Sequence, residues 1–244
     1  MLQSPRMVAD PPPSAPLRLV LLDCDGTIVD GQAAAVGAMA AALGHLGLPA
    51  PAEMALRAVI GLPPAEQMAR LLPADIDPAA AAAALAHYRS TFQSMSRDPA
   101  LAEPLYPGMR KALERIAAAG VLLGIVTGKG RRSLLATLAH HDLERHFVTL
   151  HTADDGPGKP APDMVQRAIC RTGADAGSTM VVGDTIFDIQ MALNARVHAV
   201  GVAWGYHPAL ALKRAGAERI ATMPAELPRI IHELLPGDRD APRL

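Results

Sequence analysis

The sequence predicts an α/β protein: a doubly wound, Rossmann-like parallel sheet with an inserted small α-helical domain. Over residues 17–30 and 102–244, short apolar runs that suit buried strands alternate with helical patterns. Residues 31–101 carry helix signals and no convincing strand, which predicts a separate helical unit between the first strand and its crossover helix. The 244 residues, half of them hydrophobic, are enough for one large domain or two modest ones.

The elements follow in order from their patterns and end signals. The first strand is Leu19–Leu22, a continuous apolar run. In the inserted block, Gly47 can end the first helix, and Asp77 followed by Pro78 is typical of a helix start. The block's helices are expected at 33–46, 52–60, 64–72 and 78–95. Later helices are expected at 109–119, 131–141, 163–172, 186–195, 209–215 and 228–235, and strands at 121–126, 146–151, 180–182, 197–202 and 219–221.

The composition excludes several classes of protein. The formal charge is −1 and the aromatic content is 3%, so the sequence lacks the basic stripe and the aromatic stacking platform that a nucleic-acid binder needs. No apolar run reaches membrane-spanning length, and the proline-rich residues 1–16 are expected to form a flexible tail. The nine histidines are scattered, which disfavours a zinc enzyme. Two cysteines fit a reducing compartment, so we expect a cytoplasmic protein, as a monomer or homodimer.

Two carboxylates end the first strand. Asp23 and Asp25 are separated by Cys24, so they point the same way from an extended backbone while Cys24 points into the core. Gly26 and Thr27 then turn the chain. Two carboxylates this close repel unless a cation or a shared proton lies with them, which predicts a metal site, an acid/base role, or both. An Asp-Gly turn whose carboxylates satisfy backbone amides is the structural alternative.

Further polar groups follow the other predicted strands. The carboxyl ends of parallel strands share one edge of the sheet, so these groups should converge on one cleft. Taken singly, each also suits a structural role such as a helix cap or a solvated loop, but a purely structural sheet has no need of all of them together. The groups are Thr127, Gly128 and Lys129 after the second strand, Lys159 after the third, and Asp184 and Asp188 after the fourth.

The residue types indicate phosphoryl transfer. Asp23 can act as a nucleophile, and Asp25 can hand a proton to a leaving oxygen and later take one from water. With Asp184 and Asp188, Asp23 offers the oxygen ligands that Mg²⁺ prefers. Thr127 and nearby amides can hold phosphate oxygens, and Lys159 can offset the crowded negative charge. The neighbouring residues Gly26, Thr27, Gly128 and Lys129 are candidate substrate contacts.

These motifs, in this order, resemble those of the haloacid dehalogenase-like superfamily over about Leu17 to Leu235. Within it the chain looks most like the phosphoglycolate phosphatase branch. The residues that carry the resemblance are Asp23 to Thr27 for the first motif, Val126 to Gly128 for the second, Lys159-Pro160 for the third, Gly183 to Thr185 with Asp188 for the fourth, Arg57 with Ile60 to Leu62 for a cap loop, and Gly201 to Pro208 for the stretch after the fifth strand.

The resemblance implies a nucleophile at Asp23 and a general acid/base at Asp25, whose backbone carbonyl also binds Mg²⁺. It also implies phosphate contacts from Thr127 and Lys159, metal ligation by Asp184, and a role beside the metal for Asp188. Residues 31–101 would form a helical cap over the cleft, with Arg57 and the loop 60–64 reaching toward a small phosphate ester. Gly128 departs from the pattern, because the branch often has asparagine there.

Two other functions are compatible with the same motifs. A phosphosugar mutase would use the same aspartates and return the phosphoryl group to the sugar, but the cap offers no clear Lys/His pair for a second substrate orientation. A catalytically silent binding protein of the same fold is the other alternative, which the intact set of catalytic residue types disfavours. The sequence therefore favours a Mg²⁺-dependent phosphatase of small phosphomonoesters.

Overall fold

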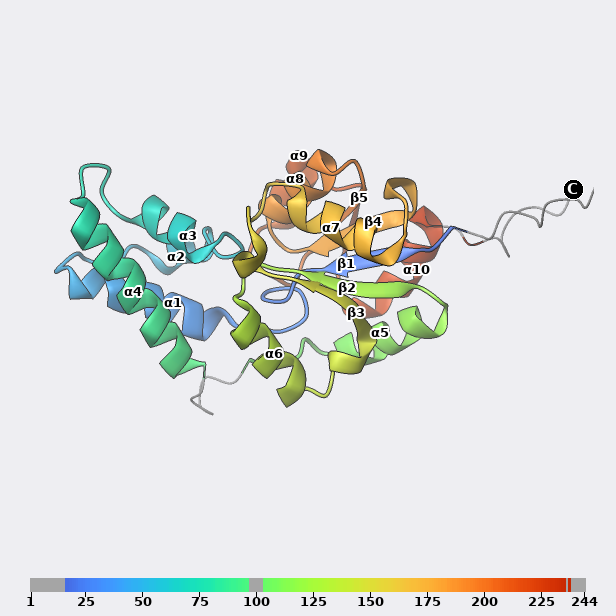
Figure 1. Ribbon diagram of the computed structural model, residues 1–244, viewed down its shortest axis with the longest axis horizontal. Coiled ribbons are helices and arrows are strands. Elements are labelled where there is room, and N and C mark those ends of the chain that lie inside the picture. The colour runs from blue at the N-terminus through green and yellow to red at the C-terminus, as the bar shows by residue number, and fades with distance from the viewer. Residues whose placement is uncertain (1–15, 97–102, 236, 238–244) are drawn as a thin grey trace, which may run out of the picture.

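The computed structural model describes residues 16–96, 103–235 and 237. It consists of a parallel sheet flanked by helices and a helical block at one end (Figure 1). Apart from Pro16, the predicted flexible tail lies outside the described residues, as does the predicted boundary between the helical block and the core at residues 101 and 102.

Six strands form one sheet in the order β3-β2-β1-β4-β5-β6. Every neighbouring pair is parallel, as predicted. The strand order reverses direction between β1 and β4, and ligands of open α/β sheets bind at the carboxyl ends of the strands on either side of such a point. The strands are β1 (Leu19–Leu22), β2 (Leu122–Val126), β3 (Phe147–His151), β4 (Thr179–Gly183), β5 (His198–Val202) and β6 (Arg219–Ala221).

Helices cover both faces of the sheet, which explains why the central strands are continuously apolar (Figure 1). Val20 and Leu22 of β1 pack into one core cluster, and Leu19 and Leu21 into the other. The first cluster takes residues from α5 (Met109–Ala118), α6 (Arg131–His140) and α10 (Leu227–Leu234). The second takes residues from α7 (Asp163–Thr172), α8 (Ile186–Asn194) and α9 (Ala209–Ala215).

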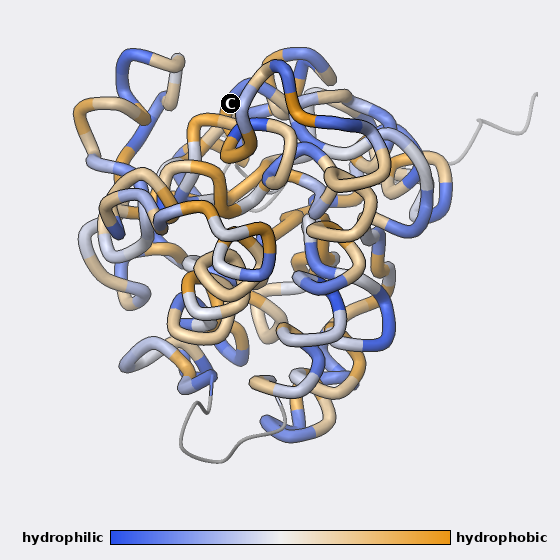
Figure 2. The backbone as a smooth tube through the Cα atoms, turned by 90° about the vertical axis from the view of Figure 1, so that its left-hand side faces the viewer, coloured by the Kyte–Doolittle hydropathy of each residue, from blue (hydrophilic) through white to orange (hydrophobic). Residues whose placement is uncertain are grey.

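The inserted block has a hydrophobic cluster that is largely its own. Its helices are α1 (Gln32–His45), α2 (Glu53–Arg57), α3 (Pro64–Leu71) and α4 (Pro78–Met95). Each helix contributes at least one buried residue to that cluster: Met39, Leu56, Met68 and Tyr88, in the order of the helices. Figure 2 views the molecule from the side of this block and shows hydrophobic and hydrophilic stretches alternating along the tube, as expected when each helix buries one face.

The predicted elements occur in the predicted order. Asp77 is the N-cap of α4, and its side chain accepts hydrogen bonds from the backbone amides of Ala79 (3.0 Å) and Ala80 (3.1 Å). Most boundaries lie within a residue of the expectation, but the second helix of the block is shorter, ending at Arg57. Among the described helices, none combines the length and the apolar character that crossing a bilayer requires.

Within residues 16–96 and 103–235, four short 3₁₀ helices occur that were not predicted. Each has three residues, which is too few for a hydrophobic period to be visible in the sequence. They are stabilised locally instead: the Thr152 hydroxyl accepts from the amide of Asp154, and Asp155 accepts from the amide of Thr152 (2.7 Å). The four are η2 (Glu144–His146), η3 (Ala153–Asp155), η4 (Ala176–Ser178) and η5 (Pro224–Glu226).

Candidate active site

Polar side chains meet at the carboxyl edge of the sheet because the chain leaves each strand there. Asp23 follows β1, and its amide donates to the carbonyl of Val182 in β4 (3.0 Å). Thr127 follows β2, and its amide donates to the carbonyl of His151 in β3 (3.0 Å). Asp184 follows β4 directly. The hydrogen-bonding pattern of the sheet therefore continues one residue past β1 and β2. It fixes the backbone positions of Asp23 and Thr127, from which their side chains extend.

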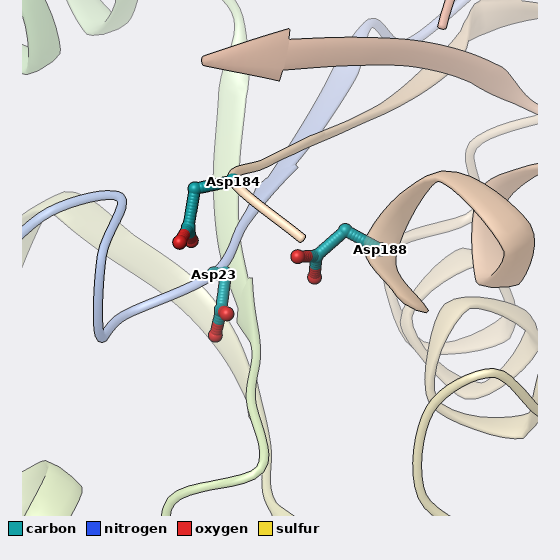
Figure 3. Close-up of side chains that lie close together, drawn as sticks. All are labelled: Asp23, Asp184 and Asp188. Atoms are coloured by element: carbon teal, nitrogen blue, oxygen red, sulfur yellow. The ribbon is translucent and has the colours of Figure 1, made fainter. Parts of the chain in front are cut away.

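Asp23, Asp184 and Asp188 form a buried acidic cluster (Figure 3). One carboxylate oxygen of each lies within 4.8 Å of the others. The three residues are exposed by 1%, 0% and 0%, so water does little to screen their mutual repulsion. The predicted approach of the first and fourth strand ends is thus present in the structure.

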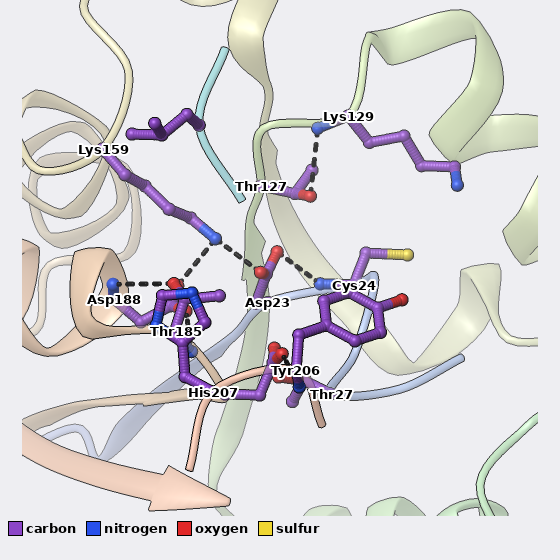
Figure 4. Close-up of polar contacts among 12 residues, drawn as sticks. Asp23, Cys24, Thr27, Thr127, Lys129, Lys159, Thr185, Asp188, Tyr206 and His207 are labelled. Atoms are coloured by element: carbon purple, nitrogen blue, oxygen red, sulfur yellow. Dashed lines mark hydrogen bonds and ion pairs between the residues drawn. The ribbon is translucent and has the colours of Figure 1, made fainter. Parts of the chain in front are cut away.

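Lys159 lies between two of these carboxylates. Its ammonium nitrogen is 2.6 Å from Asp23 Oδ2 and 2.6 Å from Asp188 Oδ1, and its side chain is fully buried (Figure 4). The loop after β3 therefore delivers a lysine to carboxylates that follow β1 and β4. Burying a lysine is costly unless it is paired, and these two contacts provide the pairing.

Asp184 is oriented by two hydrogen bonds. The Thr27 hydroxyl donates to its Oδ1 (2.9 Å), and the Tyr206 amide donates to its Oδ2 (2.9 Å). Gly26, at φ +81°, approaches so closely that a Cβ would lie 2.2 Å from Asp184 Oδ2. Gly205 is equally close to the Asp184 Cβ, also at 2.2 Å. The two glycines let the backbone wrap around this carboxylate.

Asp188 is held by the start of α8. The amide and hydroxyl of Thr185 donate to its Oδ2 at 3.0 and 2.6 Å, while the Thr185 hydroxyl caps the helix. A Cβ on Gly183 would lie 2.2 Å from the Asp188 Cγ, so only glycine fits at the end of β4. With Lys159 on its other oxygen, Asp188 is positioned as a partner of the lysine as well as a member of the acidic cluster.

The electrostatics of the cluster favour protons or cations. Burial, with the charges of Asp188 and Asp25, raises the pKa of Asp23 to about 7, against the opposing effect of Lys159. Burial and the neighbouring carboxylates Asp188 and Asp23 hold the pKa of Asp184 well above its ordinary value. Although burial by itself lowers the pKa of Lys159, Asp188 and Asp23 raise it above the ordinary value, so this lysine stays charged.

The residues present fit a hard divalent cation. All the possible metal ligands in this cluster of described residues are carboxylate oxygens, which Mg²⁺ prefers. The cluster contains none of the thiolates or imidazoles that zinc prefers. Asp23 and Asp184 would hold such an ion, with Asp188 beside them. The excess of carboxylates over lysine at this point is what the ion would neutralise.

A second buried cluster lies beside the first. Lys129 Nζ is 2.8 Å from Asp25 Oδ1 and 2.8 Å from Glu103 Oε1, with 1% of its side chain exposed. Figure 4 shows the Lys129 side chain extending away from Asp23, whereas Lys159 points toward it. The Thr137 hydroxyl donates to Glu103 Oε2 (2.7 Å), which holds the Glu103 carboxylate in place. The sequence prediction missed Glu103, because it precedes a helix in an irregular segment and follows no strand.

A cavity of about 780 Å³ opens over the nucleophile candidate. Asp23, Asp25 and Thr127 line it from the sheet edge, together with Gly128 and Lys129. The loop 60–64 and one face of α4 line it from the helical block. Its volume lies in the range typical of sites for small molecules. The predicted loop of the helical block therefore does face the predicted site residues.

The structure does not bring every candidate to this cavity. Arg57 is not among the lining residues, and its closest ion pair is a loose one with Glu53 at 3.9 Å. Thr27 serves Asp184 rather than the cavity wall. Cys24 is wholly buried in the core cluster that includes Val20, as expected.

Comparison with known proteins identifies the family. The model of the haloacid dehalogenase-like hydrolase family matches residues 20–202. A relative named probable phosphatase IndB, from Dickeya dadantii, is 34% identical over 220 residues, covering 89% of this chain and 94% of its own. A phosphoglycolate phosphatase from Agrobacterium fabrum is 30% identical over 198 residues, covering 77% and 81%.

Solved structures show the same fold. A predicted phosphatase from Clostridium acetobutylicum has a TM-score of 0.79 at 23% identity, covering 89% of this chain and 99% of its own. A putative β-phosphoglucomutase from Bacteroides vulgatus has a TM-score of 0.76 at 19% identity, covering 91% of both chains. At these identities the likeness concerns architecture only, and proteins with different named activities share it.

The chain belongs to the haloacid dehalogenase-like hydrolase family, in its phosphoglycolate phosphatase-like branch. It is an enzyme of the phosphatase class. The resemblance read from the sequence motifs is thereby confirmed, as is the parallel α/β fold.

Proposed function

We propose that the protein is a Mg²⁺-dependent phosphatase that hydrolyses a small phosphomonoester through an aspartyl-phosphate at Asp23. The observation that carries the proposal is the position of Asp23. Its carboxylate lines the cavity while contacting Lys159, and it also belongs to the acidic cluster with Asp184 and Asp188. One oxyanion can therefore face a substrate on one side and cationic charge on the other.

In the first step, an Asp23 carboxylate oxygen attacks the phosphorus of the ester. The bond between phosphorus and the ester oxygen breaks, and its electron pair stays on that oxygen. The carboxyl group of Asp25 gives its proton to the same oxygen, so the alcohol leaves neutral. Burial raises the pKa of Asp25 against the opposing effect of Lys129, which favours the protonated form that this step needs.

In the second step, water attacks the phosphorus of the aspartyl-phosphate. Asp25, now a carboxylate, takes a proton from the water, and the bond between phosphorus and the Asp23 oxygen breaks with its electron pair returning to the carboxylate. Inorganic phosphate leaves and both aspartates regain their starting states. The proton that Asp25 lost in the first step is thus recovered.

The other residues hold and balance charge. Thr127 and the amides after it can donate to phosphate oxygens, and Lys159 offsets the charge of the transferred group. Mg²⁺, when bound by Asp23, Asp184 and the backbone carbonyl of Asp25, supplies positive charge that offsets the phosphoryl oxygens. Carboxylate oxygens support Mg²⁺ rather than a softer metal. The Asp184 carboxylate is already oriented by its hydrogen bonds from Thr27 and Tyr206.

We also propose that residues 31–101 act as a cap and that the enzyme works in the cytoplasm. The cap is supported by the separate hydrophobic cluster of the helical block and by its loop 60–64 on the cavity wall. The location is supported by the two cysteines, which are both free.

The test measures free phosphate released from 2-phosphoglycolate and a panel of sugar phosphates, with and without Mg²⁺. We expect release that depends on Mg²⁺ and is abolished in Asp23→Asn. Isomerisation of a sugar phosphate without release of phosphate would favour the mutase instead. No turnover of any ester by the Mg²⁺-loaded protein would favour a silent binding protein.

A further inference from the structure

We propose that Arg89 forms a subsite for a second anionic group of the substrate. The substrates would then be phosphomonoesters that carry a carboxylate or a second phosphate away from the reacting phosphate. This inference rests on the proposed phosphatase activity and adds to it the class of substrate.

The cavity has room for such a group. Its volume of about 780 Å³ is several times what a phosphate group needs. Asp23, Asp25 and Thr127 occupy the sheet side, where the phosphate would react. Arg89 comes from α4 of the helical block, so it belongs to the wall that would face the remainder of the substrate.

Several polar side chains on that wall already form hydrogen bonds within the protein. The Tyr88 hydroxyl donates to Gln67 Oε1 (3.0 Å), and Gln67 Nε2 donates to the carbonyl of Leu62 (2.8 Å). The Ser90 hydroxyl donates to the carbonyl of His87 (3.0 Å). These groups shape the wall and are less available to recognise a ligand.

Arg89 differs from the other cation in the cavity. Among the lining residues that the structure describes, Lys129 and Arg89 are the only cationic side chains. Lys129 is neutralised by Asp25 and Glu103. Arg89 is exposed and forms no ion pair with any described residue. Its charge is therefore the one available to a ligand in this part of the chain.

The helix geometry and the chemistry of arginine fit this role. Arg89 and Gln93 are four residues apart, so they lie on one face of α4, and both line the cavity. A guanidinium group presents a planar fork of donors that matches a carboxylate or phosphate. An amide one turn away can add a further hydrogen bond. A substrate whose far end is neutral would offer the guanidinium no counter-charge.

The experiment compares matched pairs of substrates that differ only in a carboxylate. The pairs, in order of length, are 2-phosphoglycolate against 2-hydroxyethyl phosphate, 3-phosphoglycerate against glycerol 1-phosphate, and 6-phosphogluconate against glucitol 6-phosphate. Fructose 1,6-bisphosphate against fructose 6-phosphate tests a second phosphate. We expect kcat/KM to favour the anionic member of at least one pair by about tenfold, the range of a charge-assisted hydrogen bond.

The variant Arg89→Gln should abolish that preference, mainly by raising KM, while the neutral member keeps its kcat/KM. Arg89→Lys should retain part of it. Arg70→Gln is the matched control, because Arg70 is an exposed arginine of the same block that packs on Phe187 and is not in the cavity wall. It should leave the preference intact.

Several outcomes overturn the inference. If no pair shows a preference, or if the preference survives in Arg89→Gln, Arg89 does not bind a second anion. If Arg89→Gln lowers kcat/KM equally for both members, Arg89 contacts the reacting phosphate instead. In all three cases the phosphatase activity itself stands. If the wild-type protein releases phosphate from none of these esters, both proposals fail.

Discussion

Two buried lysines divide four carboxyl groups of the site between them. Lys159 contacts Asp23 and Asp188, while Lys129 contacts Asp25 and Glu103. In the described part of the chain Asp184 pairs with no lysine, and its hydrogen bonds come from the neutral Thr27 hydroxyl and Tyr206 amide. Negative charge therefore exceeds positive charge at this edge of the sheet, so a divalent cation fits there. Burial, together with this excess of negative charge, raises the pKa values of Asp23 and Asp184.

The pairing of Lys129 predicts a role in stability that a pure substrate contact would lack. Lys129→Met removes the cation that pairs with both Asp25 and Glu103, and both carboxyl groups are largely buried. Breaking a buried ion pair from one side costs about 3–5 kcal/mol. We therefore expect Lys129→Met to lower the free energy of unfolding by about this amount, as measured by urea denaturation.

The double variant Lys129→Met/Glu103→Gln is the control for this prediction. Removing the charge of Glu103 as well relieves one of the two unpaired carboxylates, so part of the lost stability should return. An unchanged free energy of unfolding in Lys129→Met, together with a raised KM, would show that Lys129 acts on the substrate only.

At the residue scale, the sequence was most informative where side chains follow strands. Asp23, Thr127 and Asp184 could be placed at one edge because parallel strands put their carboxyl ends together. Glu103 could not, because its approach to Lys129 depends on how an irregular segment packs against α6. Arg89 was missed for a related reason: which residues of an alanine-rich helix face the cavity depends on how the helix is packed.

At the scale of elements, the loop 60–64 rests directly on loops of the core. A Cβ on Gly128 would lie 2.8 Å from the carbonyl oxygen of Gly61 and 3.0 Å from that of Leu62. A Cβ on Gly158 would lie 2.2 Å from Pro63 Cγ. The absence of side chains at two core glycines thus lets this loop reach the cavity.

This contact predicts the effect of Gly128→Ala. The methyl group would meet backbone atoms of the loop, so the loop must move outward by part of an ångström or more. Small displacements of positioning groups are costly to catalysis, and we expect kcat/KM for phosphate release to fall by about 10–100-fold. We expect only a small change in the thermal midpoint, because a shift of this size should leave Ile60 and Leu62 buried in the hydrophobic cluster of the helical block.

Gly177→Ala is the matched control. A Cβ on Gly177 would meet nothing within 4 Å, and this glycine lies in η4, outside the cavity wall. It should keep wild-type kinetics. Wild-type kcat/KM in Gly128→Ala would mean that the seating of the loop on the core is not needed for turnover.

Helices and strands with several turns or a continuous apolar run could be predicted, and short elements could not. The helix Asp163–Thr172 was predicted with its observed bounds, because its apolar residues recur at helical spacing. The helix expected at 52–60 ends at Arg57, since the next residues form turns that lead to Gly61 at φ +100°. Tertiary packing of this loop against the core decided that boundary.

At the scale of the whole molecule, the insertion point links the fold to the chemistry. β1 lies in the middle of the sheet, and the helical block begins soon after it, at Gln32. The segment that carries Asp23 and Asp25 therefore leads directly into the helical block, whose loop 60–64 and helix α4 line one wall of the cavity. The stability of the folded chain is coupled to the charge state of this segment, because its carboxyl groups are buried on folding.

The raised pKa values predict how stability depends on pH. A carboxyl group whose pKa is higher in the folded chain than in the unfolded chain favours folding while it is protonated. Asp23 has a pKa of about 7 in the folded chain against an ordinary value of 3.8. Its contribution in the metal-free protein should therefore be lost as the pH rises from about 4 to about 7. Asp184 and Asp25 act in the same direction.

Mg²⁺ should reverse this trend, because it binds the deprotonated carboxylates and competes with the protons. We expect the rise in thermal midpoint on adding Mg²⁺ to be larger at about pH 8 than at about pH 6, by about 3–5 °C, since one proton displaced per ion weakens binding about tenfold per pH unit below 7. Differential scanning fluorimetry at constant ionic strength measures this, and Asp184→Asn, which lacks one ligand, should show little rise at either pH. An equal or larger rise at the lower pH would mean that the ion does not displace protons from these aspartates, and the metal site would then have to lie elsewhere.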